Sequence, residues 1–220
     1  MNPLDTQKLI SDDSAAAHQL RAGFKWLRFE HDLEREFRRE YTRNQLPQIR
    51  RHLYLAALLV VVFGALNGLV LGPGAHTALY VVQFGLLFPI VAGAIFVAHH
   101  PNARKLYPRV APVLAPVMGL LVIAVELKAA QTGVQIVFAS VLLTSVYLYF
   151  LIGLLFYESL RANAIILCAY VGFGTVGGLP ESHMIYNSLV LLIGNIVGAT
   201  VAYSLEMESR THFLEQRMLQ

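Results

Sequence analysis

The feature that most constrains this chain is a series of apolar segments, each close to the length that a helix needs to cross a bilayer. A membrane-spanning helix needs about 20 mainly apolar residues. The segments that fit are 52–71, 78–98, 110–127, 136–157, 164–179 and 185–205. Only 14% of the residues are charged, against about 25% in a typical soluble domain. The sequence therefore predicts an all-α integral membrane protein whose transmembrane domain, residues 52–205, is a six-helix bundle.

The basic residues predict how this bundle is oriented. Sixteen of the 17 Lys and Arg residues lie in the N-terminal region, in the second and fourth links or in the C-terminal tail. Only Lys128 falls in an odd-numbered link. Because Lys and Arg accumulate in cytoplasmic loops, the even-numbered links and both termini are expected in the cytoplasm.

The region before the first span divides into a mobile cytoplasmic tail, residues 1–25, and a cytoplasmic amphipathic helix, residues 26–51. In this helix Leu33, Phe37 and Tyr41 recur every fourth residue, and we expect it to end near Pro47. Two interpretations stay open. The helix is either solvated on all its charged faces, or it lies on the inner membrane surface, which the six arginines between residues 35 and 51 favour.

The last 15 residues, 206–220, continue from the sixth span without a helix-breaking residue. Four residues, Met207, Thr211, Leu214 and Met218, follow steps of four, three and four, the spacing of a coiled-coil seam. We interpret this segment as the start of a signalling helix that pairs in a homodimer. Its open end indicates a longer protein that continues into the cytoplasm.

A small-residue pattern, Gly194-x3-Gly198, lies in the span that leads into this helix. Such patterns allow helices to approach closely. They predict either a dimer contact that feeds directly into the signalling helix or packing within one subunit.

Polar residues inside the apolar segments are candidates for function, since burying them in lipid is costly. Asn67, Gln83, Glu126 and Asn187 all map to the outward half of their spans, and His183 lies in an outer link. The hypothesis is a pocket for a small or lipid-like ligand. The alternative is that Glu126 reaches the aqueous boundary while the amides bond helix to helix.

Metal and cofactor sites are not expected. His52, His99 and His100 map to one membrane level, but adjacent histidines on a helix point about 100° apart. The sequence has no HxxxH or Cys/His set that would support a metal. Its single cysteine, Cys168, cannot form an internal disulfide, and no nucleic-acid partner is expected.

Three stretches resemble the membrane domains of bacterial nucleotide cyclases. The stretch LRFEHDLEREFRREYTRNQLPQIRRHLYLAALLVVVFGALNGLVL resembles their "LRF-P" start, charged helix and aliphatic first span, with Asn67 at a place where aspartate is common. The stretch FYESLRANAIIL is similar to their "LRFRYA" turn. The exit YSLEMESRTHFLEQRMLQ resembles the pattern "YxLExxxRxxFLxxRxL" that precedes the catalytic domain. The resemblance covers about residues 27–220.

This resemblance implies a regulatory domain in the bacterial inner membrane. Such domains precede GGDEF diguanylate cyclase domains or class III adenylate cyclase domains, both of which act as dimers. We slightly favour a diguanylate cyclase as the output, because that enzyme is so frequent on membrane sensors. The chain has no GGDEF motif, cyclase metal-binding aspartates or nucleotide-binding loop, so catalysis is expected in a C-terminal cytoplasmic domain of the parent protein. The alternatives are a small membrane transporter and a structural membrane anchor.

Overall fold

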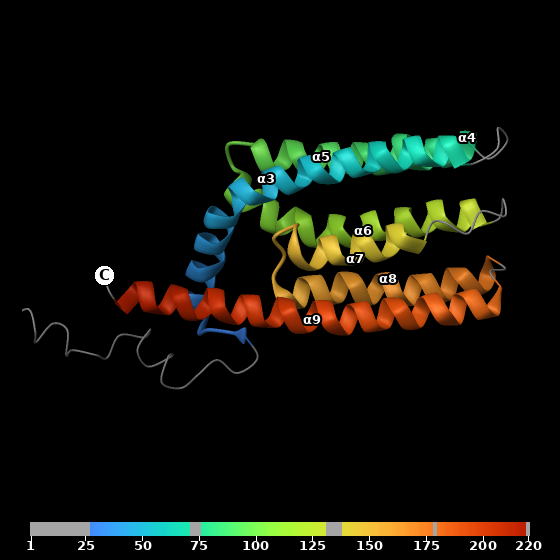
Figure 1. Cartoon of the computed structure of the whole chain (residues 1–220). Helices are drawn as coiled ribbons and strands as arrows, with labels where there is room; N and C mark the ends of the chain where they lie inside the picture. The colour runs from blue at the N-terminus through green and yellow to red at the C-terminus, as the bar shows by residue number, and fades with distance from the viewer. Residues whose placement is uncertain (1–26, 71–75, 131–137, 178–179, 219–220) are drawn as a thin grey trace, which may run out of the picture. The chain divides into compact units, whose positions relative to one another are not determined.

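The computed structural model describes residues 27–70, 76–130, 138–177 and 180–218. Every element of secondary structure in these ranges is a helix, and none is a strand (Figure 1). The elements are α3 (His31–Val70), α4 (His76–Val82), the π-helix η2 (Gln83–Leu87), α5 (Phe88–His99), α6 (Ala103–Ala130), α7 (Phe138–Phe150), α8 (Phe156–Val176) and α9 (Glu181–Met218). The all-α prediction is confirmed for the described residues.

Five helical stretches are long and apolar enough to cross a membrane. They are His31–Leu69, Leu79–His99, Ala103–Ala129, Phe156–Val176 and Glu181–Arg217. The sixth apolar helix, α7, has 13 residues and is therefore about 20 Å long, shorter than the ~30 Å hydrocarbon core of a bilayer. The described residues thus contain several helices that are able to span a membrane, five of them long enough by themselves, and the sixth span stays a prediction.

The first helix differs from the prediction. The sequence predicted an amphipathic helix that ends near Pro47 and a separate first span, but α3 runs without interruption for 40 residues and contains Pro47. A proline inside a helix removes one backbone hydrogen bond, and its ring crowds the preceding turn, yet packed membrane helices tolerate it. The polar segment and the first span are therefore one helix.

The connection between α7 and α8 also differs from the prediction. The segment ESLRAN was expected as a link, but it belongs to the first turns of α8, and the link is residues 151–155. Gly153 has a positive φ of 73°, which glycine adopts without strain. The Tyr107 hydroxyl donates to the Ile152 carbonyl oxygen at 2.8 Å, and the Glu158 carboxylate accepts from the Leu155 N–H at 3.4 Å. These contacts fix the turn before the polar residues.

The π-helix η2 lies directly before Pro89. Because Pro89 has no N–H, it cannot donate to the residue one turn earlier, and its ring pushes that turn open. The Phe88 N–H reaches back to the Gln83 carbonyl oxygen, the wider spacing of a π-turn. This widened turn contains the buried side chains of Gln83 and Leu87.

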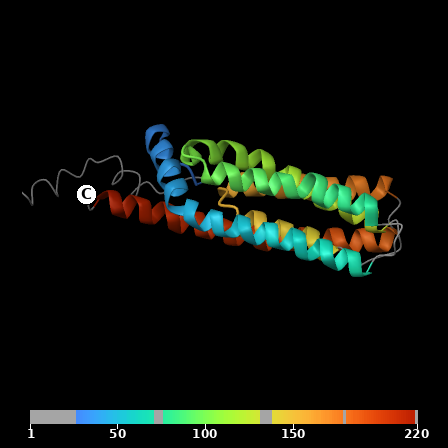
Figure 2. The same cartoon turned by 90° about the horizontal axis from the view of Figure 1, so that it is seen from above.

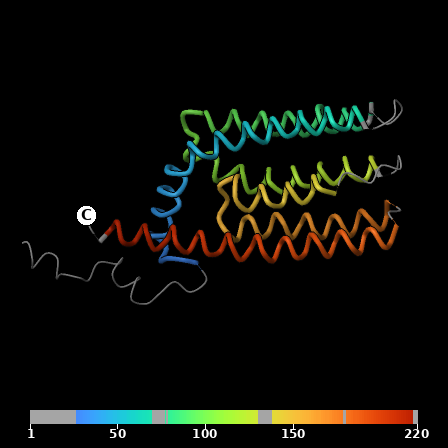
Figure 3. The backbone as a smooth tube through the Cα atoms, viewed as in Figure 1, coloured from blue at the N-terminus to red at the C-terminus, as the bar shows by residue number. Residues whose placement is uncertain are grey.

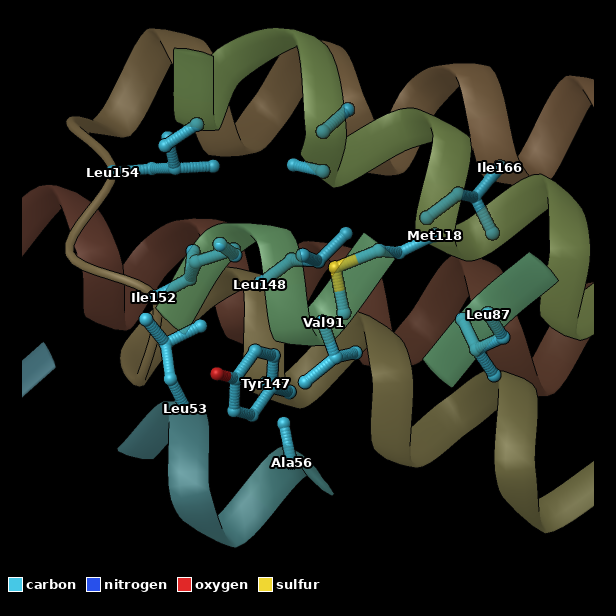
Figure 4. Close-up of a cluster of buried hydrophobic side chains, with 14 of the residues drawn as sticks. Leu53, Ala56, Leu87, Val91, Met118, Tyr147, Leu148, Ile152, Leu154 and Ile166 are labelled. Carbon is cyan, nitrogen blue, oxygen red and sulfur yellow. The ribbon is translucent and has the colours of Figure 1, made fainter. Parts of the chain in front are cut away.

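Residues 45–202 form one compact unit, which we call the membrane unit. Its successive passes run in alternating directions, α3, α4–α5, α6, α7, α8 and α9 (Figures 1 and 3). The central helix is α6, which packs against α4, η2, α5, α7 and α8. Figure 4 shows the buried core, where Leu53, Val91, Met118, Leu148 and Ile166 come from five different helices.

The outer faces of the membrane unit are apolar. Large side chains such as Leu69, Phe96, Val176 and Ile193 are each at least 60% exposed. Exposed apolar residues on this scale are unfavourable in water and favourable in lipid. The exposed surface therefore agrees with a membrane-spanning protein.

A second compact unit combines the two ends of the chain. Its described parts are residues 27–44 and 203–218, and we call it the terminal unit. Both α3 and α9 continue through the two units as single helices; Figures 1 and 3 show α9 along its whole length, whereas in Figure 2 other helices cover its middle part. The chain therefore enters the membrane unit through α3 and leaves it through α9, and the outer parts of these two helices contact each other within the terminal unit.

Candidate functional site

The terminal unit is organised around Arg210, whose side chain is only 1% exposed. Its guanidinium makes a two-pronged hydrogen bond to Glu34, with Nη1 at 2.7 Å from Oε2 and Nη2 at 3.1 Å from Oε1. Its Nε donates to Glu206 Oε1 at 2.8 Å, one turn earlier on α9. The geometry is the paired one in which an arginine recognises a carboxylate most strongly. It joins residues that are 176 positions apart in the sequence.

Aromatic rings enclose the same guanidinium. Its central carbon lies 4.3 Å from the centroid of the Phe37 ring and 4.8 Å from that of Phe29. Phe213 contacts both rings, with centroids 6.0 Å from Phe29 and 5.5 Å from Phe37. A desolvated cation above an aromatic face gains about 2 kcal/mol. The rings therefore exclude water from the ion pair and also stabilise its cation. We call Phe29, Glu34, Phe37, Glu206, Arg210 and Phe213 the arginine cluster.

Arg38, which lies beside the arginine cluster, balances its charge. Arg38 donates from Nε to Glu34 Oε1 at 3.0 Å, so two guanidiniums face the carboxylates of Glu34 and Glu206. Burial by itself raises the pKa of the Glu34 carboxyl, but the hydrogen bonds and charge of Arg210 outweigh it, with further contributions from the Phe29 N–H and Arg38. The net result is that the pKa of Glu34 is lowered from its ordinary value of 4.5. Glu34 is therefore ionised at neutral pH and available to Arg210.

Residues 27–30, directly before α3, have a backbone conformation that brings Leu27 and Phe29 to this cluster. Leu27 is fully buried and has a positive φ of 51°, a conformation that costs a non-glycine residue about 1–2 kcal/mol. The Phe29 N–H then donates to Glu34 Oε2 at 3.2 Å. Burial of Leu27 and Phe29 offsets the strained backbone. The LRF residues thus have a structural role, which is to close the arginine cluster from the N-terminal side.

A cavity of about 90 Å³ lies in the membrane unit between α3, η2, α6 and α7. Two predicted ligand-binding residues line it, Asn67 and Gln83, together with apolar side chains and with Ser140, Thr144 and Tyr147. Gln83 is 3% exposed. It accepts from Asn67 at 3.2 Å, and its Nε2 donates to the Val60 carbonyl oxygen at 2.7 Å. Most of the lining side chains are apolar, and Gln83 is bonded within the chain, so the cavity is mainly apolar in character.

Two further predicted residues, Glu126 and Asn187, belong to a different cluster. The Asn187 amide donates to the Tyr170 hydroxyl at 3.0 Å, and that hydroxyl donates to Glu126 Oε1 at 3.3 Å. Glu126 is 6% exposed, and its second oxygen, Oε2, has no hydrogen-bond partner among the described residues. An ionised carboxylate buried without a counterion costs several kcal/mol, while an unpaired buried hydroxyl costs about 1–3 kcal/mol. The carboxyl therefore lacks the donor or cation that its ionised form needs.

The single pocket predicted from the sequence is thus divided. Asn67 and Gln83 line the cavity, Glu126 and Asn187 form a chain through Tyr170, and His183 is exposed at the start of α9. Asn67 bonds to Gln83 and Asn187 bonds to Tyr170, so these amides join one helix to another, as in the alternative interpretation. The carboxyl of Glu126 is buried, so it does not extend to the aqueous boundary.

The residues predicted for the dimer and signalling helix are placed as follows. Gly194 and Gly198 face α7 of the same chain, where a Cβ would lie 3.0 Å from Leu142 and 2.5 Å from Tyr149. Leu214 is completely buried within the single chain, Thr211 is half-buried and Met207 is 37% exposed. The side chain of Met218 lies outside the described residues. The glycines therefore serve packing within one subunit, and their part in a dimer stays a prediction.

The three histidines considered for a metal each bond elsewhere. His52 contacts the Leu151 carbonyl oxygen at 2.9 Å, His99 contacts the Ile95 carbonyl oxygen at 2.9 Å, and the His100 ring accepts from the Asn102 N–H at 3.1 Å. Within the described ranges, no group of three or more His, Cys, Asp or Glu side chains is close enough to hold a metal ion.

The sequence interpretation did not name Arg210 and Glu206 as site residues, although both are fixed positions of the exit pattern "YxLExxxRxxFLxxRxL", as is Phe213. They are also an acidic and a basic residue one helical turn apart, the spacing that Glu34 and Arg38 have on α3. Nothing in that local pattern indicates that Arg210 contacts Glu34, because the contact depends on how α3 and α9 meet.

A comparison with models of known protein families found no match, and a comparison with curated proteins found none either.

Proposed function

We propose that this chain is the transmembrane regulatory domain of a signalling protein and that it transmits a stimulus along α9. The observation that carries this proposal is the arginine cluster. Since α9 is continuous from Glu181 to Met218, any displacement of its membrane part reaches Arg210 directly. At Arg210 the helix is held by residues 29–37, so its position beyond the membrane unit depends on a defined set of contacts.

The mechanism is a shift between two arrangements of these contacts. In one arrangement Arg210 is paired with Glu34, and in the other the pair is broken and the end of α9 is free to move. A stimulus can favour one arrangement only by the difference in its affinity for the two. The cavity lined by Asn67 and Gln83 and the cluster of Glu126, Tyr170 and Asn187 are the two places where such a difference could arise.

The output that we propose is a nucleotide cyclase, with diguanylate cyclase ahead of adenylate cyclase. Support for it comes from the resemblance of residues 27–220 to the membrane domains of these enzymes. Both enzymes act as dimers, so we also propose a homodimer. Because Leu214 is buried within the chain, the dimer contact of the exit helix would use the more exposed Met207 and Thr211.

We place this domain in the bacterial inner membrane with six spans and both termini in the cytoplasm. The charge distribution and the alternating passes support this topology, since α7 returns between α6 and α8 (Figure 1). A reporter active only in the cytoplasm, fused after Asn102 or after Gln220, tests it. Activity at both positions is expected. Activity at Asn102 alone would mean that α7 does not cross and that five helices span the membrane.

The function is tested by joining Gln220, in the register of the continuing helix, to a GGDEF domain and measuring cyclic di-GMP. We expect Arg210→Ala to change the output severalfold, because it frees α9 from residues 29–37. Arg38→Ala is the matched control, since it removes an exposed arginine from the same carboxylate and should leave the output near wild type. Equal output from wild type and Arg210→Ala would favour a structural anchor. Reading the gene beyond Gln220 identifies the natural output.

A further inference from the structure

The polar cluster of Glu126, Tyr170 and Asn187, on α6, α8 and α9, contains a buried carboxyl group, that of Glu126, which has no contact with the arginine cluster. Hydrogen bonds run in one direction through it, from the Asn187 amide to the Tyr170 hydroxyl and from that hydroxyl to Glu126 Oε1. This direction uses one carboxyl oxygen as an acceptor and leaves Oε2 open. Oε2 is buried, with no partner among the described residues. The open position therefore needs either a proton or a cation.

We propose that Glu126 is a proton-binding site of the membrane unit, with the proton held on Oε2. A proton needs no space, whereas Oε2 has almost no exposed surface and an organic amine would need a cavity beside it. A metal cation would need several more oxygen ligands, and no cluster of three or more acidic, His or Cys side chains surrounds Glu126 in the described ranges. The proton is the ligand that the geometry accepts without rearrangement.

Among the described residues, no charged group forms an ion pair with the Glu126 carboxyl. In the part of the chain that the structure describes, Tyr170 is its one hydrogen-bond partner, so α4, α5, η2 and α7 supply none. Lys128, two residues later on α6, has an exposed side chain. Glu181 and His183, at the start of α9, are exposed as well.

Loss of the proton has a direct structural consequence. The ionised carboxylate would lie uncompensated beside Tyr170, which is itself the acceptor for Asn187 on α9. Hydration of the charge requires these helices to separate, and α9 is the helix that continues to Arg210. The link from proton to output rests on the proposed function, whereas the proton site does not.

The proton can be observed by infrared spectroscopy of the full chain in lipid nanodiscs. Carboxyl groups in water are ionised at pH 7, so the carbonyl-stretch band of a protonated carboxylic acid isolates a buried one. We expect this band in the wild type at pH 7, its loss in Glu126→Gln, and its reversible loss as the pH is raised. Glu181→Gln, which changes an exposed carboxyl, is the matched control and should keep the band.

Three results would overturn the proposal. The first is a wild type without the band at pH 7, and the second is a band that survives in Glu126→Gln. The third is a band that disappears at constant pH when sodium replaces choline, which would make a metal cation the ligand. Because the band is recorded without any output domain, its failure leaves the proposed regulatory function standing.

A second measurement covers the case in which the band is obscured. A native state that holds a proton released on unfolding loses stability as the pH rises. As the pH is raised from about 6 to about 9, the thermal midpoint of the wild type should therefore fall relative to that of Glu126→Gln. Parallel midpoints over this range would overturn the proposal.

Discussion

Replacement of Arg210 by alanine is the perturbation with the largest expected effect on the terminal unit. The substitution removes a guanidinium from Glu206, whose side chain is 5% exposed, and it leaves Glu34, 19% exposed, with Arg38 and the Phe29 N–H. Removing one partner of a buried ion pair costs about 3–5 kcal/mol. Because Glu34 keeps Arg38 and some exposure, we expect the lower end of this range, about 3 kcal/mol.

The assay is amide hydrogen exchange followed by mass spectrometry in lipid nanodiscs. At about 1.4 kcal/mol for each factor of ten, the loss corresponds to roughly 100-fold more frequent opening. Exchange in residues 31–44 and 203–214 should accelerate by this factor. Amides of α6 serve as the internal reference, because the substitution lies in the other compact unit.

The matched control is Arg38→Ala, which removes a 49% exposed arginine from the same Glu34 carboxylate. Exposed pairs one helical turn apart contribute about 0.3–0.5 kcal/mol, so exchange should rise by about a factor of two. If Arg210→Ala accelerates exchange no more than Arg38→Ala does, then burial does not determine the strength of these pairs and the reasoning fails.

Three further predictions concern groups in both units. Because the pKa of Glu34 is lowered in the folded protein, its contribution to the stability of the terminal unit is complete above its ordinary pKa of 4.5 and is lost as the pH falls below it. Exchange corrected for its intrinsic pH dependence should show this loss in the wild type and not in Glu34→Gln. Gly198→Ala should lower the thermal midpoint, because its Cβ would lie 2.5 Å from Tyr149. Gly172→Ala is the control and should raise the midpoint slightly, because nothing lies within 4 Å of its Cβ. Equal shifts of the two midpoints would contradict the packing of α9 on α7. Gln83→Leu removes the hydrogen bonds to the Val60 carbonyl oxygen and from the Asn67 amide, so we expect a loss of about 1–3 kcal/mol, measured as the free energy of unfolding in detergent. A stability equal to wild type would show that the amide network is not stabilising.

The sequence alone determined the class of fold, because an all-α membrane fold can be read from the length and apolar character of each segment by itself. An apolar segment of membrane length becomes a helix wherever lipid surrounds it, since its backbone groups can be satisfied only within the segment. The same evidence does not fix where helices end. Pro47, for example, lies inside α3. The polar residues of ESLRAN lie in the first turns of α8, because a neighbouring helix supplies a hydrogen bond that places the turn at residues 151–155.

The candidate sites were decided by the tertiary structure. The sequence identified Asn67, Gln83, Glu126 and Asn187 as polar residues inside apolar segments, but it could not show that they belong to two clusters, since that depends on which helix faces which. The sequence assigned no role to Arg210, which entered only as one fixed position of the exit pattern. A charged residue one turn from an acidic residue is an ordinary pattern on a solvated helix. Only the meeting of α3 and α9 buries that arginine, brings Glu34 to it and encloses it between two phenylalanine rings.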